Sequence, residues 1–207
     1  GSLKRLQTDY IDRYYAHRDE TATDQAEAAQ GFGALVTAGK VRTLGASNFT
    51  ADRLTTARSA AKAQGVAAYV AIQNEFNLVV RDQFEGAVQD MCVADGIASF
   101  PYFGLASGFL TGKYRVAADL EQRPRGYRVR AYFDKGQPIL AAMDKVAADT
   151  GAKHAHIALA WINAQPGIAA PIASASRVEQ VADLVVGATL VLSQDHLDLL
   201  NAARPRS

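Results

Sequence analysis

The sequence predicts an α/β fold of the barrel type, and three observations lead to this prediction. Short segments rich in β-branched and aromatic residues alternate with segments of helical period, which is typical of a parallel sheet with right-handed crossovers. No G-x-G-x-x-G pattern follows a strand, so the usual sign of a doubly wound nucleotide-binding sheet is missing. Polar residues follow almost every expected strand instead, and this suits a barrel whose site is assembled at the carboxyl ends of many strands. These residues are His17, Ser47-Asn48, Gln73, Tyr102 and Ser174.

Five strands are expected along the chain. They cover residues 9–16, 41–46, 69–73, 97–102 and 168–172, each a short run in which β-forming residues dominate. Five strands cannot close an eight-stranded barrel, and an open fragment would leave two long sheet edges in water. Further strands are therefore expected to complete the fold.

Helices are expected between these strands, because apolar residues recur there with the helical period. The clearest case has Phe84, Ala87, Val88, Met91 and Cys92 on one face and ends at Gly96. Other helices are expected near residues 24–38, 50–64, 139–147, 154–162, 178–185 and 193–200. Thr50 and Ser193 are the expected N-caps, and Gly39, Gly65 and Gly151 the expected stops.

The composition is that of a soluble globular protein, and the length suggests one domain or at most two small ones; we expect a single domain over residues 1–207. Its 22 basic and 21 acidic residues leave a net charge of +1, which gives no argument for a nucleic-acid or membrane partner. No run of 18 apolar residues and no signal-peptide pattern is present. Cys92 is the only cysteine, so an intrachain disulfide is impossible. We expect a buried, inert thiol and a reducing, cytoplasmic location.

Five segments together resemble the aldo-keto reductase family over nearly the whole chain. They are LKRLQTDYIDRYYAHR (3–18), KVRTLGASNF (40–49), AIQNEFNL (71–78), PYFGLASGFLTGKYR (101–115) and APIASASRVEQVADL (170–184). Each is a weak match alone, but their order and spacing agree with the family, especially with bacterial reductases that carry a longer loop after strand seven. The resemblance implies a (β/α)8 TIM barrel of which this chain holds strands 4–8, the first three βα units being absent from this numbering.

The resemblance also implies NADPH-dependent reduction of aldehydes or ketones, with NADP(H) as the cofactor. Hydride transfer needs the carboxamide held, one ring face open and the forming oxyanion stabilised. Ser47, Asn48 and Gln73 are expected to hold the carboxamide, Tyr102 to stack on the nicotinamide, and His17 to donate to the substrate carbonyl. The simpler alternative is that Ser47 and Asn48 cap a helix and that Tyr102 fills the core.

The phosphates have two expected sites. A clasp for the pyrophosphate is implied at Leu105, Ser107, Gly108, Leu110, Thr111, Gly112 and Lys113, where glycines let backbone N–H groups approach phosphate oxygens. Residues 113–135, with seven basic and three acidic residues, follow as a lid over the cofactor or as a solvated loop. The 2′-phosphate is assigned to Ser174, Ser176 and Arg177, and the adenine end to Gln180 and Asp183. Arg177 favours NADPH over NADH, although Leu184 stands where many relatives have asparagine.

Two features depart from the family's pattern, the proton relay and Arg13. The family's proton-relay aspartate, tyrosine and lysine come from the first three strands, so residues 1–207 alone are expected to bind cofactor without turnover. A non-catalytic cofactor-binding subunit, like the potassium-channel β subunits of this fold, is the alternative. Arg13 shares strand parity with His17, so it needs a carboxylate partner or a distorted strand. The histidines at 154, 156 and 196 are interpreted as structural, and no metal is expected.

Overall fold

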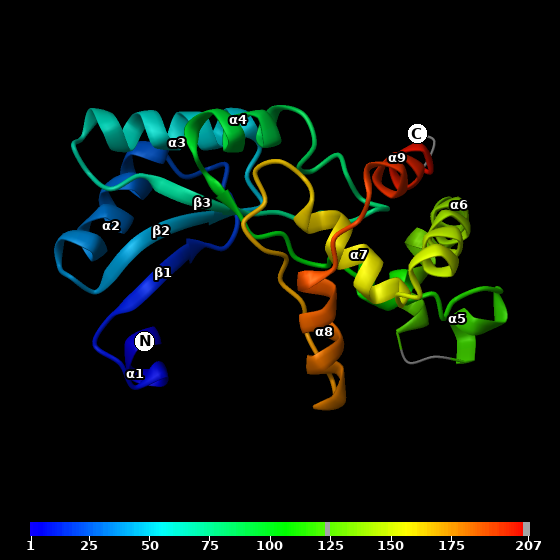
Figure 1. Ribbon diagram of the computed structural model, residues 1–207. Coiled ribbons are helices and arrows are strands. Elements are labelled where there is room, and N and C mark those ends of the chain that lie inside the picture. The colour runs from blue at the N-terminus through cyan, green and yellow to red at the C-terminus, as the bar shows by residue number, and fades with distance from the viewer. Residues whose placement is uncertain (123–124, 205–207) are drawn as a thin grey trace. The chain divides into compact units, whose positions relative to one another are not determined.

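A computed structural model of the protein describes residues 1–122 and 125–204 (Figure 1). The chain forms two compact units. The first, here called the sheet unit, contains Gly1–Asn74 and Glu85–Phe100. The second, the helical unit, contains Glu75–Phe84 and the residues from Pro101 onward. The expectation of one domain over residues 1–207 stays a prediction.

The sheet unit is built on a parallel sheet of four strands in chain order. These are β1 (Ile11–Ala16), β2 (Val41–Ser47), β3 (Tyr69–Gln73) and β4 (Ala98–Ser99). Every neighbouring pair is parallel, with Tyr15 beside Gly45 and Ser47 beside Gln73. The polar exit residues of successive strands therefore lie at one edge of the sheet.

Four helices belong to the sheet unit: α1 (Ser2–Leu6), α2 (Gln25–Thr37), α3 (Ala51–Ala63) and α4 (Ala87–Asp95). Since parallel neighbours need right-handed crossovers, α2, α3 and α4 lie on the same face of the sheet (Figure 1). Thr50 accepts from the Arg53 N–H as the expected N-cap of α3, and Gly96 ends α4 at φ 66°. The short helix α1 was not expected from the sequence.

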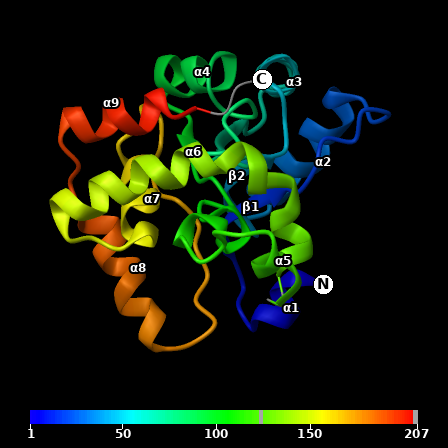
Figure 2. The ribbon, with the colours of Figure 1, turned by 90° about the vertical axis from the view of Figure 1, so that its right-hand side faces the viewer.

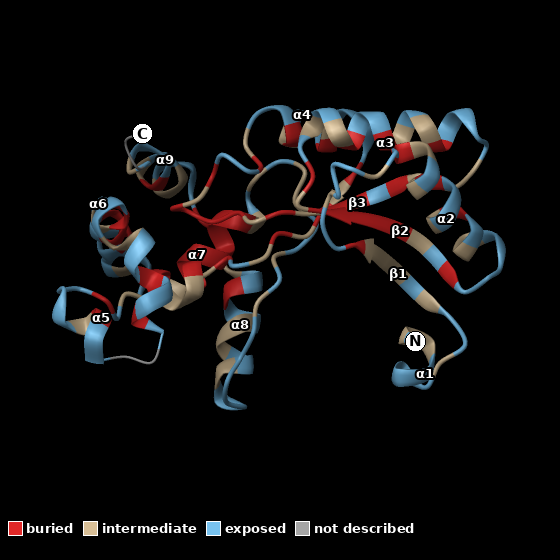
Figure 3. Ribbon diagram, turned by 180° about the vertical axis from the view of Figure 1, so that it is seen from behind, coloured by how far each residue is buried: buried red, intermediate tan, exposed pale blue. Residues whose placement is uncertain are grey.

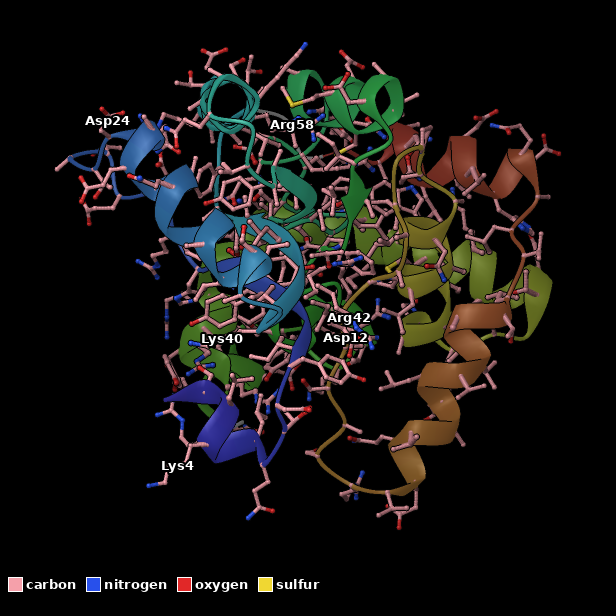
Figure 4. All side chains as sticks on the ribbon, turned by 90° about the vertical axis from the view of Figure 1, so that its left-hand side faces the viewer. Lys4, Asp12, Asp24, Lys40, Arg42 and Arg58 are labelled. Carbon is pink, nitrogen blue, oxygen red and sulfur yellow. The ribbon has the colours of Figure 1, made fainter. Side chains whose placement is uncertain are left out.

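The core of the sheet unit lies between the sheet and these helices. Figure 3 shows buried residues along β2 and β3, where Leu44, Ala46 and Ile72 are at most 1% exposed. On the outer edge, Arg42 and Asp12 point toward one another across β1 and β2 (Figure 4), 2.7 Å apart. This ion pair is mostly exposed, so it contributes little to stability.

The helical unit consists of six helices in its described residues. They are the 3-10 helix η1 (Ala106–Thr111) and the α-helices α5 (Ala118–Gln122), α6 (Gly126–Thr150), α7 (His154–Asn163), α8 (Glu179–Thr189) and α9 (Gln194–Ala202). Helix α7 is buried over most of its length (Figure 3), and Trp161 in its last turn packs against Phe76. Ser193 caps α9 as expected, accepting from the His196 N–H.

A buried arginine ties α9 to the core of the helical unit. Arg81 is 5% exposed, lies 4.6 Å from the Trp161 ring centre, and donates to the Leu200 carbonyl and the Asn201 side chain. Trp161 Nε1 donates to the same Asn201 oxygen at 3.0 Å. The buried charge of Arg81 thus contacts oxygens and a ring face, and these contacts offset part of the cost of removing it from water.

Two of the five strand predictions need correction, and a proline accounts for each. The strand expected over 97–102 is only β4, because Pro101 cannot donate to a ladder. The strand expected over 168–172 is wrong: Pro171 lies within it, and the segment meets its neighbour through one bond, from the Ile172 N–H to the Pro101 carbonyl at 2.7 Å.

One helix prediction and the loop prediction for 113–135 also need correction, whereas the helix expected near 178–185 is confirmed as α8. The helix expected from Phe84 begins at Ala87, since Phe84 closes a preceding turn. The polar stretch 113–135 is largely helical, forming α5 and the first part of α6, while Arg123 and Pro124 lie outside the described residues. The valines that mark α8 do not face a core: Val178, Val181 and Val185 are all more than half exposed. Within the described residues, no helix is long and apolar enough to cross a membrane.

Candidate functional site

The exit residues of three neighbouring strands are hydrogen-bonded together in the sheet unit. The Asn48 side-chain amide follows β2 and donates to the His17 carbonyl at 2.9 Å and to Ser47 Oγ at 3.0 Å. Ser47, which is 2% exposed, donates in turn to the Gln73 carbonyl at 2.6 Å. The sequence expectation that His17 and the Ser47-Asn48 pair share one end of the sheet is therefore confirmed.

The sequence reasoning missed Asn74, which fixes this cluster from below. Its side chain is 3% exposed and accepts from the Asn48 N–H at 2.8 Å, while its amide donates to the Phe49 carbonyl at 2.9 Å. Asn48 has a φ of 60°, a left-handed conformation that asparagine tolerates better than most residues. The adjacent Gln73-Asn74 pair at a strand exit was the available signal.

The loop that follows His17 is held to α3 by an ion pair. Arg53 donates to both carboxylate oxygens of Asp19, at 2.6 and 2.7 Å, and Gln25 adds a third bond at 3.2 Å. The hydrogen bond that Arg53 donates to Asp19 raises the pKa of Arg53. His17 itself is exposed, so its imidazole can meet a ligand.

Arg13 resolves its unfavourable position without distorting β1. Its Nε lies 3.4 Å from Thr43 Oγ1, and its guanidinium stacks 4.7 Å from the Phe100 ring centre. The side chain is half-buried. Arg13 therefore contacts a hydroxyl and an aromatic face, and not the carboxylate that the sequence analysis expected.

In the helical unit, residues 103–113 form a tight left-handed segment, here called the glycine-rich segment. Positive φ occurs at Phe103, Ala106, Ser107, Gly108 and Gly112. Several bonds close it on itself, including Gly108 N–H to the Leu105 carbonyl and Thr111 Oγ1 to the Gly108 carbonyl, both at 2.8 Å. Leu110 is fully buried and anchors it.

The pyrophosphate role expected for this segment stays a prediction. The N–H groups of Ala106, Gly108, Leu110 and Gly112 donate to carbonyls of the segment itself. Lys113 adds a positive charge beside it, because its Nζ lies 3.5 Å from the point that a Cβ on Gly108 would occupy. A bare glycine backbone and an ammonium group thus lie close together.

Tyr102 precedes this segment and is half-buried rather than part of a core. Its ring packs edge-on against Phe103, with centroids 5.1 Å apart, and its backbone bridges to Glu75. The alternative that Tyr102 merely fills the core is thus weakened. Its expected stacking on the nicotinamide stays a prediction.

The residues predicted for the adenosine end lie around the start of α8. Ser174, Ser176 and Arg177 are exposed. The Gln180 side chain accepts from the Ser176 N–H at 2.8 Å and from its hydroxyl at 3.1 Å. Asp183 pairs with Lys153 at 2.7 Å and with His156 at 3.3 Å, and the Lys153 bond lowers the pKa of Asp183. Gln180 and Asp183 therefore already bind groups of the protein.

The Aldo/keto reductase family profile matches residues 1–205. The chain belongs to this family. An aldo-keto reductase of Fusarium vanettenii, NECHADRAFT_45914, is 30% identical over 99% of this chain and 56% of its own length. An aryl-alcohol dehydrogenase [NADP(+)] of Phanerodontia chrysosporium is 29% identical over 99% of this chain and 54% of its own. This family member thus spans little more than half the length of these relatives.

The fold comparison agrees with the family. A crystal structure of the thermostable aldo-keto reductase Tm1743, solved with the inhibitor epalrestat, superposes with a TM-score of 0.77. It is 24% identical and covers 98% of this chain, which covers 63% of that one. The chain thus has an α/β fold similar to that TIM-barrel-type reductase. The restriction to strands 4–8 stays a prediction.

His154 and His196 each contact an acidic side chain, which agrees with their interpretation as structural residues. His154 Nε2 lies 2.8 Å from Asp144, which also binds Arg115, and the Arg115 bond lowers the pKa of Asp144. His196 lies 3.7 Å from Asp149. Over residues 1–122 and 125–204, no group of three histidine, cysteine or acidic side chains could hold a metal ion.

Proposed function

We propose that this chain forms the nicotinamide-nucleotide site of an oxidoreductase that reduces aldehydes or ketones to alcohols. The observation that carries this proposal is the hydrogen-bonded cluster of His17, Ser47, Asn48 and Gln73 at one edge of a parallel sheet. Membership of the aldo/keto reductase family supports the same reaction class. When bound, a reduced nicotinamide nucleotide supplies the hydride for such a reduction.

In the sheet unit, the cluster would hold the nicotinamide carboxamide and the substrate oxygen. Asn48 and Gln73 offer amide groups, and Ser47 a hydroxyl. The Asn48 and Ser47 side chains are each fixed by a neighbour, so little reorganisation of these two opposes binding. His17 would donate to the substrate carbonyl from the exposed end of the cluster.

In the helical unit, the remaining predicted residues would hold the rest of the nucleotide. Tyr102 would stack on the nicotinamide, and the glycine-rich segment with Lys113 would bind the pyrophosphate. Ser174, Ser176 and Arg177 would bind the 2′-phosphate, since a guanidinium and hydroxyls at a helix start favour a dianion. Gln180 and Asp183 stay assigned to the adenine end. The NADP(+) in the name of the fungal aryl-alcohol dehydrogenase supports a preference for NADPH over NADH.

Turnover needs a proton donor besides the residues named here. The family resemblance places the aspartate, tyrosine and lysine of that relay in the first three strands of the barrel. We therefore propose that residues 1–207 correspond to strands 4–8 and bind the nucleotide, while reduction requires those further groups.

A titration with NADPH, followed by the fluorescence of the reduced nicotinamide, tests the proposal. We expect saturable binding, and weaker binding of NADH by about tenfold or more, because NADH lacks the phosphate that Arg177 would pair with. Arg177→Ala should remove most of this preference, whereas Arg5→Ala, on the exposed face of α1, should not. Absence of NADPH binding by the wild-type protein would overturn the proposal.

A further inference from the structure

Helix α6 packs directly on the glycine-rich segment within the helical unit (Figure 2). Two residues one helical turn apart, Tyr132 and Gly136, make the contact, so they share one face of the helix. A Cβ on Gly136 would lie 2.2 Å from Cε1 of Phe109, whose ring is fully buried. The close approach of α6 to η1 therefore depends on a glycine at 136.

Tyr132 is also connected to the segment through its hydroxyl, by way of Glu75. The hydroxyl donates to Glu75 Oε1 at 3.1 Å. The segment begins at Phe103, a non-glycine residue with φ 55°. A left-handed conformation costs such a residue about 1–2 kcal/mol, so a partner is needed to hold it.

Glu75 connects this bond to the start of the same segment. The Asn77 amide lies 3.5 Å from Glu75 Oε1 and donates to the Phe103 carbonyl at 3.1 Å. Asn77 is fully buried, and its own side-chain oxygen accepts from the Val79 and Val80 N–H groups at 2.9 Å. The path Tyr132–Glu75–Asn77–Phe103 thus connects α6 to the strained start of the segment.

The protonation states suit this path. Burial and, after it, the Glu75 carboxylate raise the pKa of Tyr132 to about 12, so the phenol keeps its proton and remains a donor near neutral pH. Burial also raises the pKa of Glu75, while the Tyr132 and Asn77 bonds and the charge of Lys135 oppose this and that of Asp82 adds to it.

We propose that Tyr132 is a positioning residue for phosphate binding: its hydroxyl holds Glu75, which with Asn77 holds Phe103 and so keeps the glycine-rich segment in its left-handed form. This inference rests on the proposed function, because the segment is the one assigned to the pyrophosphate. It also gives part of the 113–135 stretch a role other than that of a solvated loop.

The test compares Tyr132→Phe with Tyr127→Phe, a control on the same helix whose side chain is 70% exposed. Two quantities are measured: the NADPH dissociation constant, and amide hydrogen exchange of residues 103–113 without nucleotide. We expect Tyr132→Phe to weaken NADPH binding by about threefold to tenfold, the range for one lost hydrogen bond, and to accelerate exchange in the segment. Tyr127→Phe should change neither.

Equal affinity and equal exchange in Tyr132→Phe and the wild type would overturn the inference. A Glu75→Ala, Tyr132→Phe double variant adds a check, because its loss of affinity should match that of Glu75→Ala alone if the two side chains act together. Additive losses would contradict the hydrogen-bonded path. If the wild-type protein binds no NADPH, the proposed function fails, and the exchange rates alone then decide whether Tyr132 holds the segment.

Discussion

Replacing Asn74 with alanine should destabilise the protein and weaken nucleotide binding together. The substitution removes two bonds inside the sheet unit, one from the Asn48 N–H at 2.8 Å and one to the Phe49 carbonyl at 2.9 Å. A buried polar group left unpaired costs about 1–3 kcal/mol. The Asn48 N–H keeps a longer contact with the Gln73 carbonyl, at 3.3 Å, so losing its bond to Asn74 costs less than leaving it fully unpaired. We therefore expect a total loss of about 2–4 kcal/mol.

In a chain of this length, such a loss lowers the melting temperature by about 5–15 °C. Thermal unfolding followed by circular dichroism measures it, and the NADPH titration measures the accompanying loss of affinity. Asn163→Ala is the matched control, because its amide makes one exposed bond, to the Ala188 carbonyl at 3.3 Å. It should cost at most about 0.5 kcal/mol. An Asn74→Ala protein with the same melting temperature as the Asn163→Ala control would refute the reasoning.

Three further predictions follow from other contacts. Burial raises the pKa of Cys92 to about 11, so its thiol should resist alkylation in the native protein and react at once in denaturant; rapid native labelling would show that α4 opens. Burial raises the pKa of Glu75 above 4.5, so the native state retains a proton that the unfolded chain has released. The free energy of unfolding should therefore fall as pH rises from 4.5 through the raised pKa, and urea titrations of Glu75→Gln should lack this fall, while exposed Glu27→Gln should keep it. Gly136→Ala places a methyl group on the Phe109 ring, so denaturant titration should show a loss of about 1–3 kcal/mol, and an unchanged midpoint would mean that α6 does not pack on η1.

Local pattern predicted the first three strands and most helix ends, because these depend on residues close in sequence. Asp24, Thr50 and Ser193 cap helices where a polar side chain precedes a helical period. The last two expected strands failed where Pro101 and Pro171 interrupt β-forming runs. A proline's missing N–H can be read from sequence, but its effect depends on which neighbour needs that donor.

The candidate site was predictable only in part. Because His17 and Asn48 both follow parallel strands, the sequence predicted them at one edge of the sheet, and their hydrogen bond confirms that proximity. Asn74 was missed because its role is to bond the backbone of residues 48 and 49, which are distant in sequence. The roles of Tyr132 and Glu75 likewise arise from packing between a helix and a turn. No periodicity in the sequence signals such a contact.

The central claim is that the polar cluster at the ends of β1, β2 and β3 binds the nicotinamide half of the nucleotide. Backbone-amide NMR spectra recorded during titration with nicotinamide mononucleotide test it most directly. The account predicts the largest shifts at Ser47, Asn48 and Gln73, reduced in Asn48→Ala. Saturable binding that leaves these three amides unmoved would contradict it.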